Sequence, residues 1–187
     1  MQSVCVYCGA QLGKSPVFRE AAEQVAIDIA RAGLKLVYGG GGIGLMGIMA
    51  RAALAHGGYV IGVIPEFLRA AEASFDEANE LIVTASMHER KQRMFELADG
   101  FMVLPGGIGT LEEMVEMITW RQLGRHSNPV IIVNIDGYWD PLISLLTHFV
   151  REEFSHGALT DFFRVVTRAQ DAVPALLATA KEATESI

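Results

Sequence analysis

A glycine-rich run that ends in two adjacent carboxylates occupies residues 105–113, with the sequence Pro-Gly-Gly-Ile-Gly-Thr-Leu-Glu-Glu. It directly follows an apolar segment, Phe101–Leu104, that is typical of a buried strand. Glycines allow the backbone to turn sharply and to approach a ligand closely. A helix expected to open at Thr110 would present free N–H groups and the positive end of its dipole to an anion. The run therefore predicts a phosphate-binding loop.

Glu113 is the residue of this run that could contribute chemistry, because three residues past the expected helix start its carboxylate stays beside the loop. Thr110 and Glu113 also have the spacing of a capping box, in which the glutamate only reaches back to the N–H of the cap. The spacing alone leaves both a structural and a functional role open.

A second glycine cluster covers residues 39–47 and contains the pattern G-x-G-x-x-G from Gly42 to Gly47, with Glu66 nineteen residues further on. This pattern occurs in dinucleotide-binding proteins. Here, however, it follows the second expected strand rather than the first, and a separate phosphate loop already exists, so the dinucleotide interpretation is disfavoured. Gly9, Gly41 and Gly42 follow expected strands and are candidates for a phosphate or nucleotide loop.

Three cations, Arg90, Lys91 and Arg93, fall within four residues at the start of an expected helix. Positive charge is unfavourable at that end of a helix dipole. The pattern indicates a compensating anion, and the alternative is a solvated basic face. His88 and Glu89 begin the metalloprotease pattern H-E-x-x-H, but the second histidine is replaced by Gln92, so no metal site is expected.

Length and charge limit the partners. The chain has 187 residues, 51% of them hydrophobic and 20% charged, which suits one globular domain over residues 1–187. A net charge of -7 argues against binding to nucleic acid or to an anionic membrane. No apolar run approaches the roughly 18 residues that span a bilayer, and no secretory signal is visible. We expect a cytoplasmic protein whose partners are small molecules and other copies of itself.

The two cysteines, Cys5 and Cys8, form a C-x-x-C pattern that is found in redox and zinc sites. Three residues apart on a strand, they point to opposite faces of a sheet. A thioredoxin-type pair lies at a helix start, and no second pair completes a zinc site. We therefore interpret both cysteines as core or loop residues.

Seven short β-rich runs alternate with helical stretches along the chain, which indicates a doubly wound α/β fold of the Rossmann-like type with a mainly parallel sheet of about seven strands. The expected strands are 4–7, 34–38, 59–64, 81–84, 101–104, 130–135 and 164–167. The first helix is expected to have Ser15 as its cap and to end at Gly33. Its apolar face is expected to carry Phe18, Ala22, Val25 and Ile29. Ligands of such sheets bind outside the carboxyl ends of the strands, where the glycine-rich and basic segments fall.

The helix that follows the phosphate loop, residues 111–123, carries more apolar side chains than one sheet-facing stripe requires, namely Met114, Met117, Ile118 and Trp120. These residues either form a dimer interface or fill the core, and periodicity does not separate the two.

Three segments together carry a family resemblance: the glycine cluster of Tyr38–Gly47, the Arg-Lys pair of Met87–Lys91, and the run at 105–113. In combination they resemble the LOG family, the cytokinin riboside 5'-monophosphate phosphoribohydrolases. The resemblance extends from Cys8-Gly9 to the segment Asp136-Gly137-Tyr138.

This resemblance implies a homodimeric enzyme that hydrolyses the N-glycosidic bond of a nucleoside 5'-monophosphate, such as isopentenyladenosine monophosphate or AMP, to the free base and ribose 5-phosphate without a cofactor. Arg90 and Glu113 would be the catalytic pair. The resemblance also implies that the substrate is contacted by Glu72, Lys91, Gly106, Gly107, Ile108, Gly109, Thr110, Leu111, Glu112 and Thr119.

One position departs from the family pattern, because Ala10 stands where serine is usual, and a hydroxyl contact at the first loop is lost. Some relatives are labelled lysine decarboxylases, but none of the four lysines lies in a recognisable pyridoxal site. The alternative to an enzyme is a nucleotide-binding carrier or sensor, which would use the same loops without hydrolysis.

Overall fold

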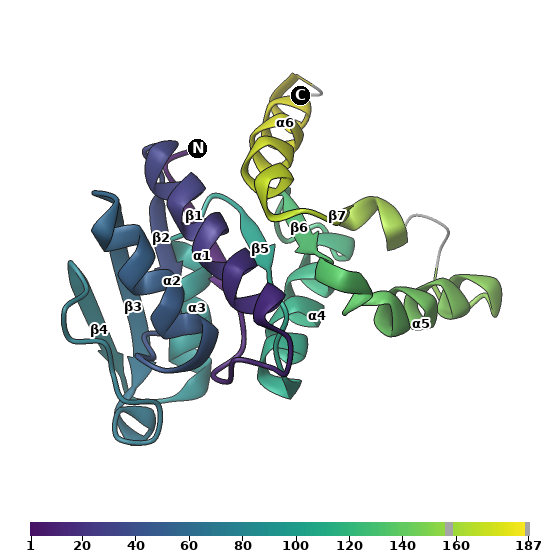
Figure 1. The fold of residues 1–187 in the computed structure, drawn as a ribbon. Helices are drawn as coiled ribbons and strands as arrows, with labels where there is room; N and C mark the ends of the chain where they lie inside the picture. The colour runs from purple at the N-terminus through teal and green to yellow at the C-terminus, as the bar shows by residue number, and fades with distance from the viewer. Residues whose placement is uncertain (156–158, 186–187) are drawn as a thin grey trace.

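Seven parallel strands form one sheet in the computed structural model, which describes residues 1–155 and 159–185 (Figure 1). Their spatial order is β4-β3-β2-β1-β5-β6-β7. The strands are β1 (Ser3–Tyr7), β2 (Lys35–Tyr38), β3 (Tyr59–Pro65), β4 (Glu80–Thr84), β5 (Phe101–Val103), β6 (Val130–Val133) and β7 (Arg164–Val166). All seven predicted strands are present, with ends within two residues of those expected.

Helices cover both faces of the sheet (Figure 1). The two faces bury separate apolar clusters, one with α1, α2 and α6 and the other with α3, α4 and α5. The α-helices are α1 (Pro16–Arg31), α2 (Gly44–Ala55), α3 (Met87–Glu96), α4 (Ile108–Gln122), α5 (Asp140–Arg151) and α6 (Ala172–Glu185), and the 3-10 turns are η1 (Glu66–Leu68), η2 (Ile135–Gly137), η3 (Leu159–Phe162) and η4 (Ala169–Asp171). The doubly wound α/β architecture is confirmed.

The first helix buries most of the predicted stripe, since Ala22, Val25 and Ile29 have no exposed surface and Phe18 is partly buried against the same cluster. Ser15 is at the N-cap position, but its side chain makes no capping hydrogen bond. Gly33, just past the helix end, has a φ of +70°, a conformation that glycine adopts at little cost.

Cys5 and Cys8 are both buried and free, and they belong to the apolar clusters on opposite faces of the sheet. The prediction that they are core residues pointing to opposite faces is confirmed. Burial raises the pKa of the Cys8 thiol far above its ordinary value, so this thiol stays protonated at neutral pH.

The order of the strands reverses at β1, which lies between β2 and β5. The segments that leave β1 and β5 are bonded to each other, because Leu104 N–H donates to the Tyr7 carbonyl (2.9 Å) and Gly9 N–H donates to the Pro105 carbonyl (3.0 Å). In doubly wound sheets this reversal creates the crevice that receives ligands. The two glycine-rich segments, residues 39–47 and 105–113, follow β2 and β5 and flank this crevice.

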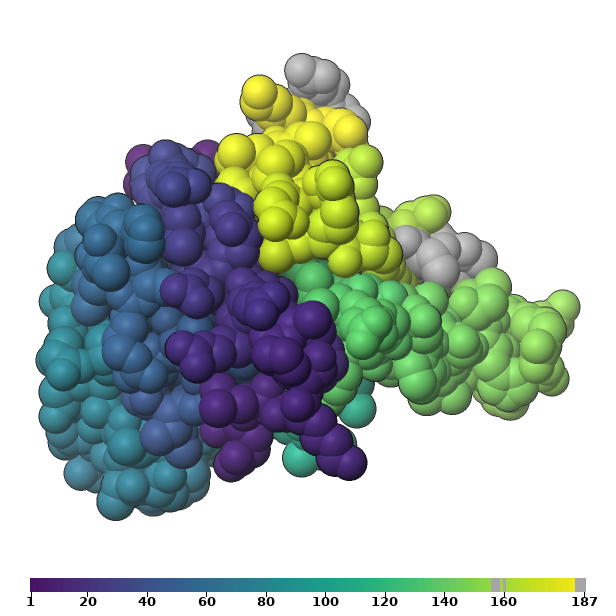
Figure 2. Space-filling view, viewed as in Figure 1, coloured from purple at the N-terminus to yellow at the C-terminus, as the bar shows by residue number. Residues whose placement is uncertain are grey.

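The four apolar residues of α4 considered for a dimer interface belong to the core. Met114, Met117 and Ile118 are buried in the cluster beneath the helix, and Trp120 is partly buried against it. The α5 helix, by contrast, projects from the body of the molecule (Figures 1 and 2). Across the described ranges, no helix combines the length and apolar character needed to span a bilayer.

Candidate active site

A cavity of about 480 Å³ opens at the carboxyl edge of the sheet, over the reversal point. It is bounded by the segments after β1, β2 and β5 and by side chains of α1, α2, α3 and α4. Nine of the predicted site residues line it: Gly9, Glu72, Arg90, Gly106, Gly107, Gly109, Thr110, Glu112 and Glu113. The predicted convergence of these segments on one edge is therefore confirmed.

The α4 helix begins at Ile108 with Gly107 as its N-cap, so the predicted start at Thr110 is wrong by two residues. Its first bond runs from Leu111 N–H to the Gly107 carbonyl (3.0 Å). The N–H groups of the first turn have no intrahelical partner and attract anions. A Cβ atom at Gly107 or Gly109 would meet no atom within 4 Å, which leaves the backbone of this turn open to a ligand.

Gly106 has the opposite environment, because a Cβ atom there would lie 2.1 Å from Thr110 Oγ1 and 2.8 Å from the Gly9 nitrogen. No side chain fits at this position. The close approach holds the loop after β5 against the loop after β1, and it fixes where α4 begins.

Glu113 does not form a capping box, because Thr110 is inside the helix and the N-cap, Gly107, has no side chain. The Glu113 carboxylate lies in the second turn of α4 and lines the cavity. Burial raises the pKa of Glu113 to about 7, although the nearby Arg90 guanidinium partly opposes this effect. The structural interpretation of the Thr110–Glu113 spacing is therefore wrong. Glu113 exchanges a proton near neutral pH.

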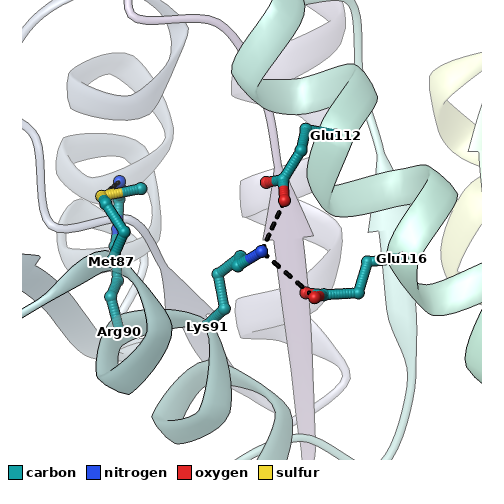
Figure 3. Close-up of polar contacts among 5 residues, drawn as sticks. All are labelled: Met87, Arg90, Lys91, Glu112 and Glu116. Carbon is teal, nitrogen blue, oxygen red and sulfur yellow. Dashed lines mark hydrogen bonds and ion pairs between the residues drawn. The ribbon is translucent and has the colours of Figure 1, made fainter.

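Arg90 lies on α3 and is only 5% exposed. Its Nε donates to the Val63 carbonyl (3.1 Å) and its Nη2 to the Gly39 carbonyl (2.8 Å), at the carboxyl ends of β3 and β2. A Cβ atom at Gly39 would lie 2.1 Å from Nη2, so this position must be glycine for the guanidinium to fit. The contact of Nη1 is weak, with Met87 Sδ at 3.9 Å (Figure 3).

Glu72 reaches the cavity from the segment after η1. Its Oε2 is 3.7 Å from Arg90 Nη2 and, within the described chain, is buried without a hydrogen-bond donor. Burial raises the pKa of Glu72, and Arg90 partly opposes this. Gly42 N–H holds the segment in place by donating to the carbonyls of Glu72 (3.0 Å) and Ala73 (2.8 Å). Glu72 is therefore a buried acceptor that faces a ligand space.

The second glycine cluster supports this segment and does not line the cavity at Gly41 or Gly42. A Cβ atom at Gly42 would lie 2.3 Å from the Ala73 carbonyl oxygen, and one at Gly47 would lie 2.0 Å from the Gly42 carbonyl oxygen. Close packing explains these glycines without a dinucleotide. Glu66 forms an exposed ion pair with Arg69 (3.5 Å).

Lys91 points away from Arg90 and toward α4 (Figure 3). Its Nζ donates to Glu112 Oε1 (2.5 Å) and to Glu116 Oε1 (3.1 Å), and the residue does not line the cavity. The positive charge at the start of α3 is thus compensated in part by carboxylates of the protein itself, Glu112 and Glu116. Glu89 adds to them, because its Oε2 accepts from Ala85 N–H (2.7 Å) at the helix start.

Three other residues implied by the resemblance lie outside the cavity lining. Ile108 is 81% exposed at the tip of the loop, and Leu111 packs against the core. Thr119 is exposed on α4, two turns beyond Glu112. The chain brings none of the three into the cavity.

Apolar side chains form much of the remaining wall, and the sequence did not identify them as site residues. They are Leu12, Phe18, Leu45, Met46, Met87, Met94 and Tyr138. The sequence contains no local signal that would mark most of them as site residues, because an apolar side chain on a helix is normally predicted to belong to the core. Their position at the cavity follows from the topology.

Solved structures confirm the fold. A molybdenum cofactor binding protein from Rippkaea orientalis superposes with a TM-score of 0.70 at 19% identity, covering 95% of this chain and 97% of that one. The Moco carrier protein from Chlamydomonas reinhardtii gives 0.72 at 17% identity, covering 97% and 99%. At these identities the likeness concerns the fold alone.

Proteins found by sequence comparison are more similar to this chain than the solved structures are. A family model described as "Possible lysine decarboxylase" matches residues 46–176. The probable cytokinin riboside 5'-monophosphate phosphoribohydrolase LOGL1 of Oryza sativa subsp. japonica is 46% identical over 151 residues, which are 81% of this chain and 68% of that protein. The phosphoribohydrolase LOG7 of Arabidopsis thaliana is 44% identical over 81% of this chain and 70% of its own length. None of the lining residues in the described chain is a lysine. The chain belongs to the LOG family of cytokinin riboside 5'-monophosphate phosphoribohydrolases.

Proposed function

We propose that this protein hydrolyses the N-glycosidic bond of a nucleoside 5'-monophosphate and releases the free base and ribose 5-phosphate. The observation that supports this most directly is a carboxylate, Glu113, in the same cavity as an open helix N-terminus and a buried guanidinium, Arg90. The names of relatives at 44–46% identity agree with this activity.

The substrate phosphate binds at the start of α4 in this proposal. The backbone there is open at Gly107 and Gly109, and the N–H groups of the first helical turn supply donors that no internal carbonyl uses. Anchoring the phosphate fixes the ribose relative to the carboxylate, which lowers the entropic part of the barrier.

Glu113 stabilises the transition state. As the C–N bond breaks, its electron pair leaves with the base and positive charge develops on the ribose. A nearby carboxylate stabilises that charge, and its effect is larger away from bulk water. Water then supplies a hydroxyl group to the anomeric carbon, and the proton it loses balances the one that the departing base takes up. Only ionised Glu113 performs this role.

Arg90 assists the departing base rather than the phosphate. It lies over the ends of β2 and β3, whereas the start of α4 follows β5, and β1 runs between them. Two strand spacings are about 10 Å, which suits the distance between the phosphate and the base of a nucleotide. With Nε and Nη2 held by carbonyls, Nη1 is the end of the guanidinium that can donate to the base.

The apolar wall favours a base with an apolar substituent. Phe18, Met46, Met87 and Met94 offer flexible and aromatic surface beside the polar groups. An isopentenyl group on adenine would bury its methyl groups there and gain hydrophobic free energy that AMP lacks. We therefore propose isopentenyladenosine monophosphate as a better substrate than AMP.

Two further expectations from the sequence belong to this proposal, a cytoplasmic location and a homodimer. The buried methionines of α4 no longer support a dimer, because they fill the core. Exposed apolar side chains that support one are Val115 on α4, Leu123 just past its end, and Leu145 and Phe149 on α5. Sedimentation at micromolar concentration measures the mass, and a 20.3 kDa species alone would refute the dimer.

The activity is tested by incubating the purified protein with AMP and with isopentenyladenosine monophosphate, without added metal or NAD, and measuring the free base by chromatography. Release that requires the 5'-phosphate supports the proposal, and the ratio of the two rates identifies the preferred base. Tight binding of both nucleotides without release would refute hydrolysis and support a carrier or sensor.

A further inference from the structure

Tyr138 lies at the cavity without a role in the steps above. It follows β6, the strand next to β5, and its hydroxyl donates to the Gly106 carbonyl at 2.5 Å. Its ring packs in edge-to-face geometry with Phe18 (centroids 5.4 Å apart, planes at 74°) and with Trp139 (4.9 Å, 86°). Two aromatic contacts therefore hold the ring, and its hydroxyl reaches the phosphate loop.

The turn that carries Tyr138 has an unusual backbone. Asp136 (φ +53°) and Gly137 (φ +69°) are successive residues in the left-handed region, which is unfavourable for aspartate. Asn134 stabilises the turn, because its Oδ1 accepts from Trp139 N–H and its Nδ2 donates to Asp140 Oδ1, both at 2.7 Å. The chain thus maintains a costly turn that directs Tyr138 at the neighbouring loop.

The bond to Gly106 acts on one peptide group. The peptide between Gly106 and Gly107 is planar and trans, so its C=O and N–H point in opposite directions. On the Gly107 side the peptide can rotate at little steric cost, because this residue is a glycine and a Cβ atom there would meet no atom within 4 Å. Because Tyr138 holds the carbonyl, it also fixes the direction of the Gly107 N–H, which is the N-cap donor of α4.

We propose that Tyr138 is a positioning residue that preforms the phosphate loop for a phosphate monoester. Its hydroxyl keeps the Gly106 carbonyl turned away from the anion and keeps the Gly107 N–H turned toward it. Without the hydroxyl, the peptide rotates between two orientations, and in the second a carbonyl oxygen repels the phosphate. The inference rests on the phosphate site of the proposed function, but not on hydrolysis.

Tyr138→Phe tests this, because the substitution removes one hydroxyl and keeps both ring contacts. By calorimetry, we expect the affinity for ribose 5-phosphate to fall about fivefold to tenfold, the size of one lost hydrogen bond. The affinity for adenine, which carries no phosphate, should stay the same. In the hydrolysis assay, KM for AMP should rise by a similar factor while kcat changes by less than twofold.

Tyr59→Phe is the matched control. The Tyr59 hydroxyl also makes one hydrogen bond, to Glu80 Oε1 (2.7 Å), but Tyr59 begins β3 at the amino edge of the sheet, opposite the cavity. This variant should bind ribose 5-phosphate as the wild type does. Thermal unfolding of both variants shows whether each is folded at the assay temperature.

Binding separates this inference from the proposed function. Wild-type affinity for ribose 5-phosphate in folded Tyr138→Phe would overturn the role of Tyr138, and so would an equal loss of affinity for adenine, which indicates general loosening. Failure of the wild type to bind ribose 5-phosphate or AMP would overturn the phosphate site together with this inference. A selective loss of phosphate affinity in a protein that hydrolyses nothing would support Tyr138 and refute only the hydrolysis.

Discussion

Replacing Glu113 by glutamine should greatly lower the activity of the protein and, above neutral pH, make it more stable. The pKa of Glu113 is raised from 4.5 to about 7 by burial. Between these two values the unfolded chain has lost the proton and the folded chain keeps it, so the folding free energy becomes less favourable as pH rises. Glutamine is neutral throughout and avoids this loss.

The size of the effect follows from the shift. One pKa unit corresponds to about 1.4 kcal/mol, so a fully shielded carboxylate would cost about 3 kcal/mol at pH 8. The cavity is open to water, which lowers our expectation to about 2 kcal/mol. For a domain of this size that is a rise in Tm of roughly 4 to 8 °C. At pH 5 the wild type and Glu113→Gln should differ by less than about 1 kcal/mol.

Activity should change in the opposite direction, with kcat about 100-fold to 1000-fold lower, the usual effect of removing one electrostatic group from a transition state. Glu116→Gln is the control, since Glu116 is on the same helix but pairs with Lys91 outside the cavity lining. It should keep most of the activity. Thermal scans at pH 5 and pH 8 and base release measured by chromatography give both quantities. A folded Glu113→Gln protein with the wild-type rate, or with no gain in Tm at pH 8, would refute this account.

Four other substitutions test the site and the structure around it. Gly39→Ala places a Cβ atom 2.1 Å from Arg90 Nη2 and should reduce kcat/KM at least tenfold in a protein whose circular dichroism is unchanged. Gly106→Ala places a Cβ atom 2.1 Å from Thr110 Oγ1 and should lower the free energy of unfolding by more than about 2 kcal/mol in urea titrations. The new Cβ of Gly107→Ala meets no atom within 4 Å, so the free energy of unfolding of this variant should stay within about 1 kcal/mol of the wild type. Burial lowers the pKa of His126, so folding disfavours the protonated form of this histidine. As pH falls below 6.5, the wild type should therefore lose stability relative to His126→Gln in urea titrations. Parallel pH profiles of the two proteins would contradict this.

The sheet and its edge were predictable because strand signals are local and the rule for parallel sheets places their carboxyl ends together. Alternation of β-rich runs with helical stretches gave seven strands, and their glycine-rich exits then had to meet at one crevice. The wrong predictions concerned features that depend on contacts between distant segments, which a local sequence pattern does not reveal. Threonine is the better capping residue, yet α4 begins at Ile108, because the close approach of Gly106 to the neighbouring loop fixes the chain there.

The direction of side chains was the second feature that the sequence did not predict. Arg90 and Lys91 are neighbours on α3, but one reaches the cavity and the other forms ion pairs with α4, since successive helical residues point about 100° apart (Figure 3). Their joint presence in a motif does not reveal this division. Tyr138 was unpredictable for another reason, because its contact with Gly106 spans 32 residues and depends on the adjacency of β5 and β6.

The polar groups of the cavity are arranged in a way that stability alone does not explain. Arg90 is bonded to two main-chain carbonyls, while the nearest carboxylate, Glu72, stays 3.7 Å away with a buried oxygen that has no donor in the described chain. A direct bidentate ion pair would satisfy both groups and would be the stronger interaction. Such a pair would also occupy the guanidinium and the carboxylate that a ligand needs. The chain instead fixes Arg90 from behind, through Gly39 and Val63, and leaves acidic groups in the cavity with raised pKa values. A cation that develops on a bound ribose would find these carboxylates already positioned, which is the electrostatic preorganisation that glycosidic cleavage requires.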